Sequence, residues 1–172
     1  MKEIKSIDQL LDKMWSDYIQ LNPQAKKIVE LFKERGDEVV NDHIALRTFN
    51  HPRVGIDVVA KPFLESGYVE KGDYQFKEKK LFAKHFEHPG EDMPKIFISE
   101  LKLEEFSGEF QKKIAALIEQ VSDETIKRFD FSSLGRPWKI SASLYEELRK
   151  ESDYGAWVAA IGFRPNHFTV FV

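Results

Sequence analysis

The segment at residues 39–49 constrains the fold most, because it is rich in β-forming residues and alternates along its length. Successive side chains of a β-strand point to opposite faces, so Ile44 and Leu46 share one face of this strand. We expect that face to lie in the core. The segment therefore predicts a half-buried strand within a sheet.

Segments with helical spacing come before this strand, and they are mixed with short extended segments after it. Helices are predicted at residues 6–19, 23–36, 54–66, 110–121, 123–131 and 145–157. Short strands are predicted at residues 68–69, 74–78, 81–86, 96–98 and 166–172, with residues 71–73 separating the first two. This order predicts an α+β fold, with N-terminal helices followed by a mixed, partly open β-sheet with helices.

The length of 172 residues fits one domain, and no internal repeat or low-complexity tract divides it. We expect residues 1–172 to form a single domain. Residues 168–172 make an apolar strand with no polar tail or turn after it. Natural domains seldom stop on such an edge, so we expect this domain to be incomplete at its C-terminus.

The charge and cysteine content exclude several functional classes. The 26 basic and 29 acidic residues give a net charge of −3 and are interleaved, which does not favour a nucleic-acid partner. The absence of cysteine excludes disulfides, thiolate zinc sites, iron–sulfur clusters and cysteine nucleophiles. The longest uncharged apolar run, residues 155–163, is too short to cross a bilayer, and the N-terminus has no apolar signal core. These features predict a cytoplasmic protein with no membrane partner.

One face of the strand at residues 39–49 carries groups that could bind a metal and an acid. His43, Ala45 and Arg47 are spaced two apart and therefore share that face. An imidazole can bind a metal, a guanidinium can bind a carboxylate through two hydrogen bonds, and the alanine between them leaves room for a small ligand. A histidine and an arginine satisfied by neighbouring carboxylates on a half-exposed strand would give the same pattern. The residues alone leave both interpretations open.

A second strand histidine stands near the end of the chain. His167, Thr169 and Phe171 share one face of the predicted strand at residues 166–172. A histidine in an otherwise apolar strand is costly to bury unless a partner satisfies it, and a hydrogen-bonded core histidine is the commoner outcome. His43 and His167 become a candidate metal pair only if the fold brings them together.

The remaining histidines give weaker signals. His85 and His88 have a His-x-x-His spacing, but a turn follows them and they fit solvated surface side chains. His51 lies in a turn and has no predicted chemical role. Four alternating residues either line an anion pocket or form an amphipathic strand whose lysine stems cover apolar surface. They are Lys80, Phe82, Lys84 and Phe86.

Several segments, taken together and in order, resemble one known family. They are residues 14–18 (MWSDY), 22–25 (NPQA), 41–49 (NDHIALRTF), 94–101 (PKIFISEL), 135–138 (GRPW), 154–158 (YGAWV) and 162–170 (GFRPNHFTV). They are similar to the 2-oxoadipate dioxygenase/decarboxylase family, long catalogued as a domain of unknown function, and they span nearly the whole chain. The resemblance implies a fold related to the vicinal-oxygen-chelate superfamily.

The resemblance also implies an iron(II) site held by two histidines and a glutamate, with open positions for substrate and oxygen. His43 matches the first ligand, His167 the second, and Arg47 the arginine that binds a substrate carboxylate. The glutamate is implied to lie beyond Val172. Within the chain Glu100 is the best-placed carboxylate, but the resemblance does not support it as a ligand. Another divalent metal such as zinc or nickel could replace iron in a crystal.

The reaction implied by the resemblance is the oxidative decarboxylation of a small 2-oxo dicarboxylic acid, with O2 as the second substrate, in lysine catabolism. The acid would chelate iron through its carboxylate and keto oxygens, lose CO2 and be hydroxylated, so that 2-oxoadipate would give 2-hydroxyglutarate. Two alternatives stay open. One is a lyase, isomerase or hydrolase that uses another divalent ion on the same scaffold, and the other is a non-catalytic module that binds small acids. The oligomeric state does not follow from the sequence.

Overall fold

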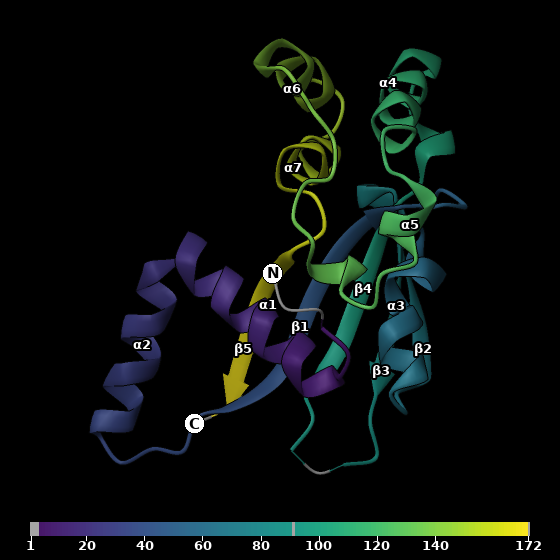
Figure 1. The fold of residues 1–172 in the computed structure, drawn as a ribbon. Coiled ribbons are helices and arrows are strands. Elements are labelled where there is room, and N and C mark those ends of the chain that lie inside the picture. The colour runs from purple at the N-terminus through teal and green to yellow at the C-terminus, as the bar shows by residue number, and fades with distance from the viewer. Residues whose placement is uncertain (1–3, 91, 172) are drawn as a thin grey trace.

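The computed structural model of the chain describes residues 4–90 and 92–171, which fold around a five-stranded sheet (Figure 1). The strands are β1 (Val40–Phe49), β2 (Val69–Phe76), β3 (Leu81–Glu87), β4 (Lys95–Leu101) and β5 (Pro165–Phe171). Their order is β2-β3-β4-β1-β5, in which β1 and β4 run parallel and the other neighbours run antiparallel. The predicted α+β fold with a mixed, open sheet is therefore confirmed.

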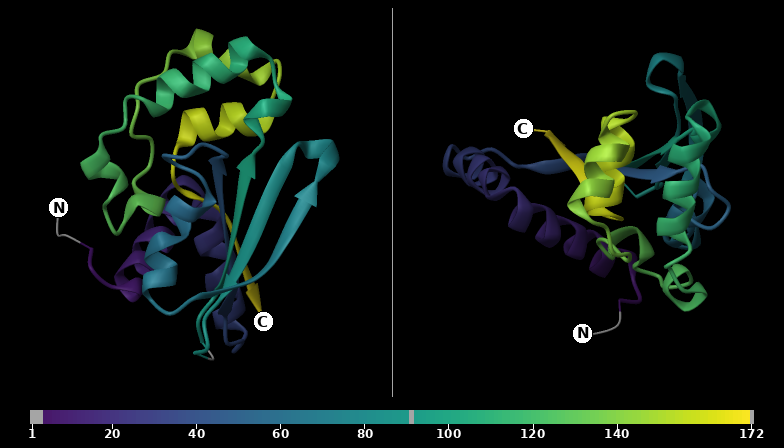
Figure 2. Two further views of the ribbon diagram at one scale, coloured as in Figure 1. Left: turned by 90° about the vertical axis from the view of Figure 1, so that its right-hand side faces the viewer. Right: turned by 90° about the horizontal axis from the view of Figure 1, so that it is seen from above.

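The described α-helices surround this sheet. They are α1 (Ile7–Leu21), α2 (Pro23–Glu34), α3 (Ile56–Glu65), α4 (Gly108–Ile118), α5 (Asp123–Ile126), α6 (Ala142–Arg149) and α7 (Asp153–Ile161). α1 crosses β5 and β1, whereas α6 and α7 stack beyond the ends of these strands (Figure 1). Seen from above, α1 and α2 lie together on one side of the sheet (Figure 2). None of the helices in the described ranges is long and apolar enough to cross a membrane.

Serine caps decide where several helices begin, and they correct two predictions. The Ser152 hydroxyl accepts the backbone N–H of Gly155 and starts α7, so the single helix predicted at residues 145–157 is wrong and two helices take its place. Ser122 caps α5 in the same way, but α5 ends at Ile126. The helix predicted at residues 123–131 is therefore too long, and a 3₁₀ turn at Phe131–Ser133 follows.

The predicted break at residues 71–73 is also wrong, because β2 runs through it. The pairing of β2 with β3 shifts register between Glu70 and Gly72, as at a β-bulge. A glycine in a strand commonly marks such an irregularity. The bulge keeps Val69–Phe76 in one strand where the sequence suggested two.

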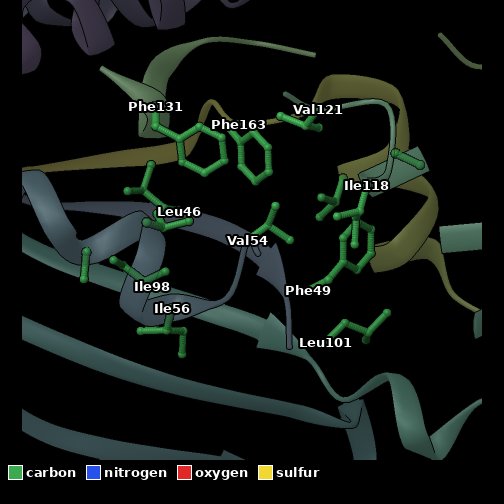
Figure 3. Close-up of a cluster of buried hydrophobic side chains, with 14 of the residues drawn as sticks. Leu46, Phe49, Val54, Ile56, Ile98, Leu101, Ile118, Val121, Phe131 and Phe163 are labelled. Carbon is green, nitrogen blue, oxygen red and sulfur yellow. The ribbon is translucent and has the colours of Figure 1, made fainter. Parts of the chain in front are cut away.

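The core lies against one face of the sheet. Ile44 and Leu46 of β1 and Ile96 and Ile98 of β4 are almost completely buried there. Figure 3 shows Leu46 and Ile98 in a cluster of apolar side chains that several elements contribute. The members it labels are Leu46, Phe49, Val54, Ile56, Ile98, Leu101, Ile118, Val121, Phe131 and Phe163. Because side chains alternate along a strand, the other side chains of β1 stand on the opposite face of the sheet, which carries the candidate site.

Candidate functional site

The antiparallel pairing of β1 with β5 brings His43 and His167 together. Ala45 lies opposite His167 and His43 lies opposite Thr169, so both imidazoles stand on the same face of neighbouring strands. Their Nε2 atoms are 3.3 Å apart, and the rings meet edge to face at 79°. The fold therefore brings the two histidines together, as a candidate metal pair requires.

The other ring nitrogen of His43 is held by two side chains. The Asp42 carboxylate accepts a hydrogen bond from His43 Nδ1 at 2.8 Å, and Thr169 Oγ1 lies 2.6 Å from the same nitrogen. The backbone N–H of His43 also donates to Thr169 Oγ1. A carboxylate that holds the proton on Nδ1 leaves Nε2 with its lone pair, which is the arrangement of a metal-binding histidine.

His167 has its own support on β5. The side-chain amide of Asn166 lies 2.9 Å from His167 Nδ1, and an amide can serve either imidazole tautomer because it carries both a donor and an acceptor. Burial lowers the pKa of His167, and the nearby positive charges of His43 and Arg47 lower it further. A lowered pKa favours the neutral imidazole, which is the form that binds metal ions.

The distance between the two Nε2 atoms fits a shared metal ion. Two nitrogens at about 2.1 Å from one ion lie 3.3 Å apart when the angle at the ion is about 100°, between the octahedral and tetrahedral values. Among the described residues, no histidine, cysteine, aspartate or glutamate completes a group of three around an ion. Two histidines can therefore contribute two ligands, and an ion held by them keeps other positions open.

Arg47 stands on the same face as the histidines, two residues along β1 from Ala45. Its guanidinium carbon lies 4.9 Å from the ring centroid of Tyr154 and 4.9 Å from that of Trp157, both on α7. Burial lowers the pKa of Arg47, but a guanidinium stays charged at any physiological pH. The site therefore places a half-buried positive charge beside the pair of histidines.

These side chains open onto a cavity of about 700 Å³, within the size range of small-molecule sites. Its wall includes His167 and Arg47, and apolar side chains such as Phe97, Leu81 and Trp157 line much of the rest. A cavity lined by apolar side chains, by cations that include Arg47 and by one histidine of the pair is suited to a small anion that can also chelate a metal.

Glu100 lies on the other face of the sheet. Its carboxylate accepts the backbone N–H of Ile56 at 3.0 Å and so takes the place of a side-chain cap at the start of α3. In the register of β1 with β4, Glu100 is the partner of Thr48, not of His43 or Arg47. The carboxylate that looked best placed in the sequence therefore does not reach the histidine pair.

The remaining histidines have partners of their own. His85 Nδ1 lies 2.8 Å from Tyr74 Oη, whereas His88 Nδ1 accepts the backbone N–H of Gly90. In the turn after β1, His51 Nδ1 accepts the backbone N–H of Arg53. Each of these three imidazole rings therefore has a hydrogen-bond partner other than His43 or His167.

The four residues at 80, 82, 84 and 86 do not form one pocket. Lys80 precedes β3 with a left-handed backbone (φ 54°) and lines the cavity near Arg47. Lys84 lies on the other face, where it pairs with Glu70 and Asp57. Phe86 is buried in the core. Of the two interpretations that the sequence left open, the shared anion pocket does not form, because Lys80 lies outside the strand and the two lysines line different cavities.

Sequence patterns alone predict no role for Tyr154, Trp157 or Asp42. Tyr154 and Trp157 lie in residues 154–158, one of the segments that resemble the family. Their spacing of three residues puts them on one side of a helix, but that spacing does not identify Arg47 as their partner. Asp42 precedes a strand histidine, which is a common arrangement without chemical meaning. Their role depends on pairings between distant segments.

Comparison with known proteins agrees with the family resemblance seen in the sequence. The sequence model of the family described as 2-oxoadipate dioxygenase/decarboxylase matches residues 1–134. A curated relative from Arabidopsis thaliana, named 2-oxoadipate dioxygenase/decarboxylase, chloroplastic, is 33% identical over 177 aligned residues, which are 95% of this chain and 48% of the relative. The chain thus spans about half the length of the curated relative. That name places the relative in the chloroplast, and the cytoplasmic location expected for this chain stays a prediction.

Solved structures share the fold. A crystal structure from Shewanella frigidimarina, described as a candidate hydrolase, superposes with a TM-score of 0.92 at 49% identity and covers 98% of this chain and 66% of that one. Hydroxyglutarate synthase from Oryza sativa, in complex with 2-oxoadipate, superposes at 0.84 with 33% identity over 94% of this chain and 56% of that one.

A more distant structure confirms the predicted type of fold. It is a protein from Ralstonia eutropha described as belonging to the glyoxalase superfamily, with a TM-score of 0.77 at 20% identity over 95% of this chain and 61% of that one. At this identity the likeness shows the fold alone, and it agrees with the predicted vicinal-oxygen-chelate-like fold. Taken with the family match over most of its length, it leads to one conclusion: the chain belongs to the 2-oxoadipate dioxygenase/decarboxylase family.

Proposed function

We propose that this chain carries two metal ligands and the substrate-binding arginine of an iron(II)-dependent dioxygenase that decarboxylates a 2-oxo dicarboxylic acid such as 2-oxoadipate. The observation that carries the proposal is the pair of Nε2 atoms 3.3 Å apart, with Arg47 on the same sheet face. The names of the relatives point to the same substrate class.

His43 and His167 would hold the ion through Nε2. Asp42 and Thr169 fix the ring of His43, because a proton held on Nδ1 keeps Nε2 free for the metal. A third ligand, expected from the family resemblance to be a glutamate beyond Val172, would complete the site. When bound, iron(II) would supply the electrons and open positions that activation of O2 requires.

Arg47 would bind a carboxylate of the acid through paired N–H donors. Its position two residues from Ala45 puts its Cα about 7 Å along the strand from the row that holds His167, which is within reach of one small molecule. The apolar wall near Phe97 and Trp157 would limit water around the reacting carbon.

The overall reaction balances without a second organic substrate. 2-Oxoadipate and O2 would give 2-hydroxyglutarate and CO2: the bond between the carboxylate carbon and the keto carbon breaks, and the two oxygen atoms of O2 enter the products. The oxidation of the acid itself supplies the electrons that reduce O2. This separates the proposed enzyme from oxygenases that consume 2-oxoglutarate beside another substrate.

The test is oxygen consumption. Iron(II) and 2-oxoadipate are added without air to this chain and to the longest natural protein that contains it, and O2, CO2 and 2-hydroxyglutarate are then followed together. Equal amounts of O2 used and of CO2 and hydroxy acid formed are expected from the longer protein. Tight iron binding without uptake of O2 in either protein would contradict the proposal.

A metal-dependent hydrolase is the second candidate, because the Shewanella frigidimarina protein at 49% identity carries that description. A hydrolase on this site would retain activity with zinc and would not consume O2. A module that only binds small acids would instead be stabilised by the acid equally with and without a chelator.

A further inference from the structure

The segment Tyr154-Gly155-Ala156-Trp157 lies at the start of α7, and its contacts with Arg47 have no part in the chemistry proposed above. Tyr154 and Trp157 each place a ring 4.9 Å from the guanidinium carbon of Arg47. Among the described residues, no carboxylate is a cause of the shift in the pKa of Arg47. The carboxylates that do line the same cavity are those of Glu78, Glu151 and Asp153. The contacts that position the guanidinium are therefore those with the two aromatic rings.

Aromatic rings suit a cation that must bind an anion. A ring attracts a guanidinium through its quadrupole but has no net charge, so it offsets part of the cost of burial without neutralising the arginine. An aspartate or glutamate in the same place would form an ion pair and would compete with any carboxylate ligand. Rings hold Arg47 in place and leave its charge available.

The ring of Tyr154 is itself fixed to two strands. Its hydroxyl donates to the carbonyl oxygen of Ser99 at 2.8 Å and lies 2.9 Å from Ser99 Oγ, and the backbone N–H of Thr48 donates to it at 3.3 Å. Burial raises the pKa of Tyr154, which keeps the hydroxyl protonated and able to donate. Tyr154 thus ties α7 to β1 and β4 beside Arg47.

The glycine of the segment lets α7 come close enough for this contact. A Cβ at position 155 would lie 2.7 Å from Phe110 Cζ and 3.1 Å from Leu101 Cδ2. Ala156 is also buried, at 1% exposure. Small residues between the two aromatic ones therefore set the distance between the helix and the sheet.

We propose that Tyr154 and Trp157 are positioning residues, which hold the Arg47 guanidinium in the cavity as an unneutralised carboxylate-binding group. This inference rests on the proposed function, since it assigns the carboxylate to an acid bound at the histidine pair. Neither aromatic residue takes part in the chemistry. Both act on the ligand through Arg47.

A double-mutant cycle separates action through Arg47 from direct contact with the ligand. The affinity for 2-oxoadipate is measured by isothermal titration calorimetry with zinc present, so that no turnover occurs. Trp157→Leu and Tyr154→Leu should each weaken binding about 2- to 30-fold, the span of cation–π energies for partly buried pairs. In an Arg47→Ala background the same changes should have no further effect.

A second readout needs no ligand. The Arg47 Nε–Hε proton resonance should move downfield in Trp157→Leu, because the ring no longer shields it. Tyr68→Phe is the matched control, because it removes a buried hydroxyl that donates to the carbonyl of Pro94 away from the cavity and should change neither readout.

Two results would overturn the inference while the proposed function stands. One is normal affinity in both leucine variants, and the other is an equal loss of affinity with Arg47 present or absent. A wild-type chain that binds no 2-oxoadipate in the presence of zinc would contradict the proposed function first, and the inference with it.

Discussion

His43 Nε2 and His167 Nε2 lie 3.3 Å apart on neighbouring strands, although the residues are 124 positions apart in the sequence. Two unprotonated nitrogens at this distance repel each other unless a proton or a metal ion lies between them. The second nitrogen of each ring already has a partner, Asp42 and Thr169 for His43 and Asn166 for His167. Both Nε2 atoms are therefore left for the shared ion that we propose.

The first prediction concerns the ligands. His43→Ala and His167→Ala should each abolish stoichiometric binding of iron(II) or zinc, because a single remaining histidine cannot hold the ion. Both side chains are only partly buried, so the melting temperature without metal should change little. Metal content after dialysis and thermal unfolding check the two parts. His88→Ala, remote from the pair, should bind metal like the wild type, and normal metal content in either of the two site variants would refute the assignment.

The second prediction concerns the support of His43. Asp42→Asn should weaken metal binding about 10- to 100-fold, because the neutral amide holds the Nδ1 proton less strongly than the carboxylate does. Competition with a chelating dye measures the affinity. The matched control is Asp57→Asn, which removes an exposed carboxylate on the other face of the sheet. Equal affinities in the two variants would mean that Asp42 has no role in holding the ligand.

The third prediction separates Arg47 from the metal. Arg47→Ala should leave metal content unchanged and weaken 2-oxoadipate binding by about 2–3 kcal/mol, the size of hydrogen bonds to a charged group, or about 30- to 150-fold. Arg47→Lys should recover only part of the loss, because an ammonium cannot form the paired contact. Calorimetry gives the affinities. Loss of metal together with ligand in both variants would argue against a separate role for Arg47.

The fourth prediction concerns pH and Glu100. Burial raises the pKa of Glu100 above its ordinary value of 4.5, and the nearby charge of Asp57 adds to the rise, although the N–H of Ile56 opposes it. The folded state therefore holds this proton to a higher pH than the unfolded state. The protonated Glu100 therefore adds to the free energy of unfolding. This contribution is fully present below pH 4.5 and is lost as the pH rises through the pKa of the folded state.

Glu100→Gln resembles the protonated form and should gain stability relative to the wild type as the pH rises through that window. Urea unfolding at a series of pH values measures the difference. Metal content should be the same in both proteins, because Glu100 faces away from the histidines. A stability difference that does not vary with pH would contradict the raised pKa, and lost metal binding would restore Glu100 as a candidate ligand.

The fifth prediction concerns the approach of α7. Gly155→Ala should destabilise the fold by about 1–3 kcal/mol, because its Cβ would overlap the ring of Phe110. Gly108→Ala is the control, since a Cβ there has nothing within 4 Å and should be neutral or slightly stabilising. Urea unfolding midpoints decide between them. Equal midpoints in the two variants would show that the helix can move away from the ring without cost.

Much of the fold could be predicted because local patterns and tertiary packing agree. The strand predicted at residues 39–49 forms as β1 at Val40–Phe49, since its even-numbered apolar side chains find a core. Predictions failed where a single residue changes the chain direction or register. Ser152 divides one expected helix into α6 and α7, and the bulge at Gly72 joins two expected strands.

Only part of the candidate site could be predicted from the sequence, because the rest depends on how distant segments pair. The spacing of His43 and Arg47 puts them on one face of any strand, so that part follows from local geometry. The meeting of His43 with His167 depends on the register of β1 with β5, which shifts twice along the pair and cannot be read from either segment. The role of Trp157 depends on how closely a helix packs, which is a property of the whole fold.

The most direct test of the central claim is the visible absorption of the iron(II) complex. A 2-oxo acid that chelates iron(II) through its carboxylate and keto oxygens produces a charge-transfer band, which free iron(II) with protein alone does not show. Titration of 2-oxoadipate without air into the iron-loaded chain should produce this band, weaken it in Arg47→Ala and abolish it in His43→Ala and His167→Ala. A band of equal strength in the histidine variants, or no band in the wild type with iron bound, would contradict the account.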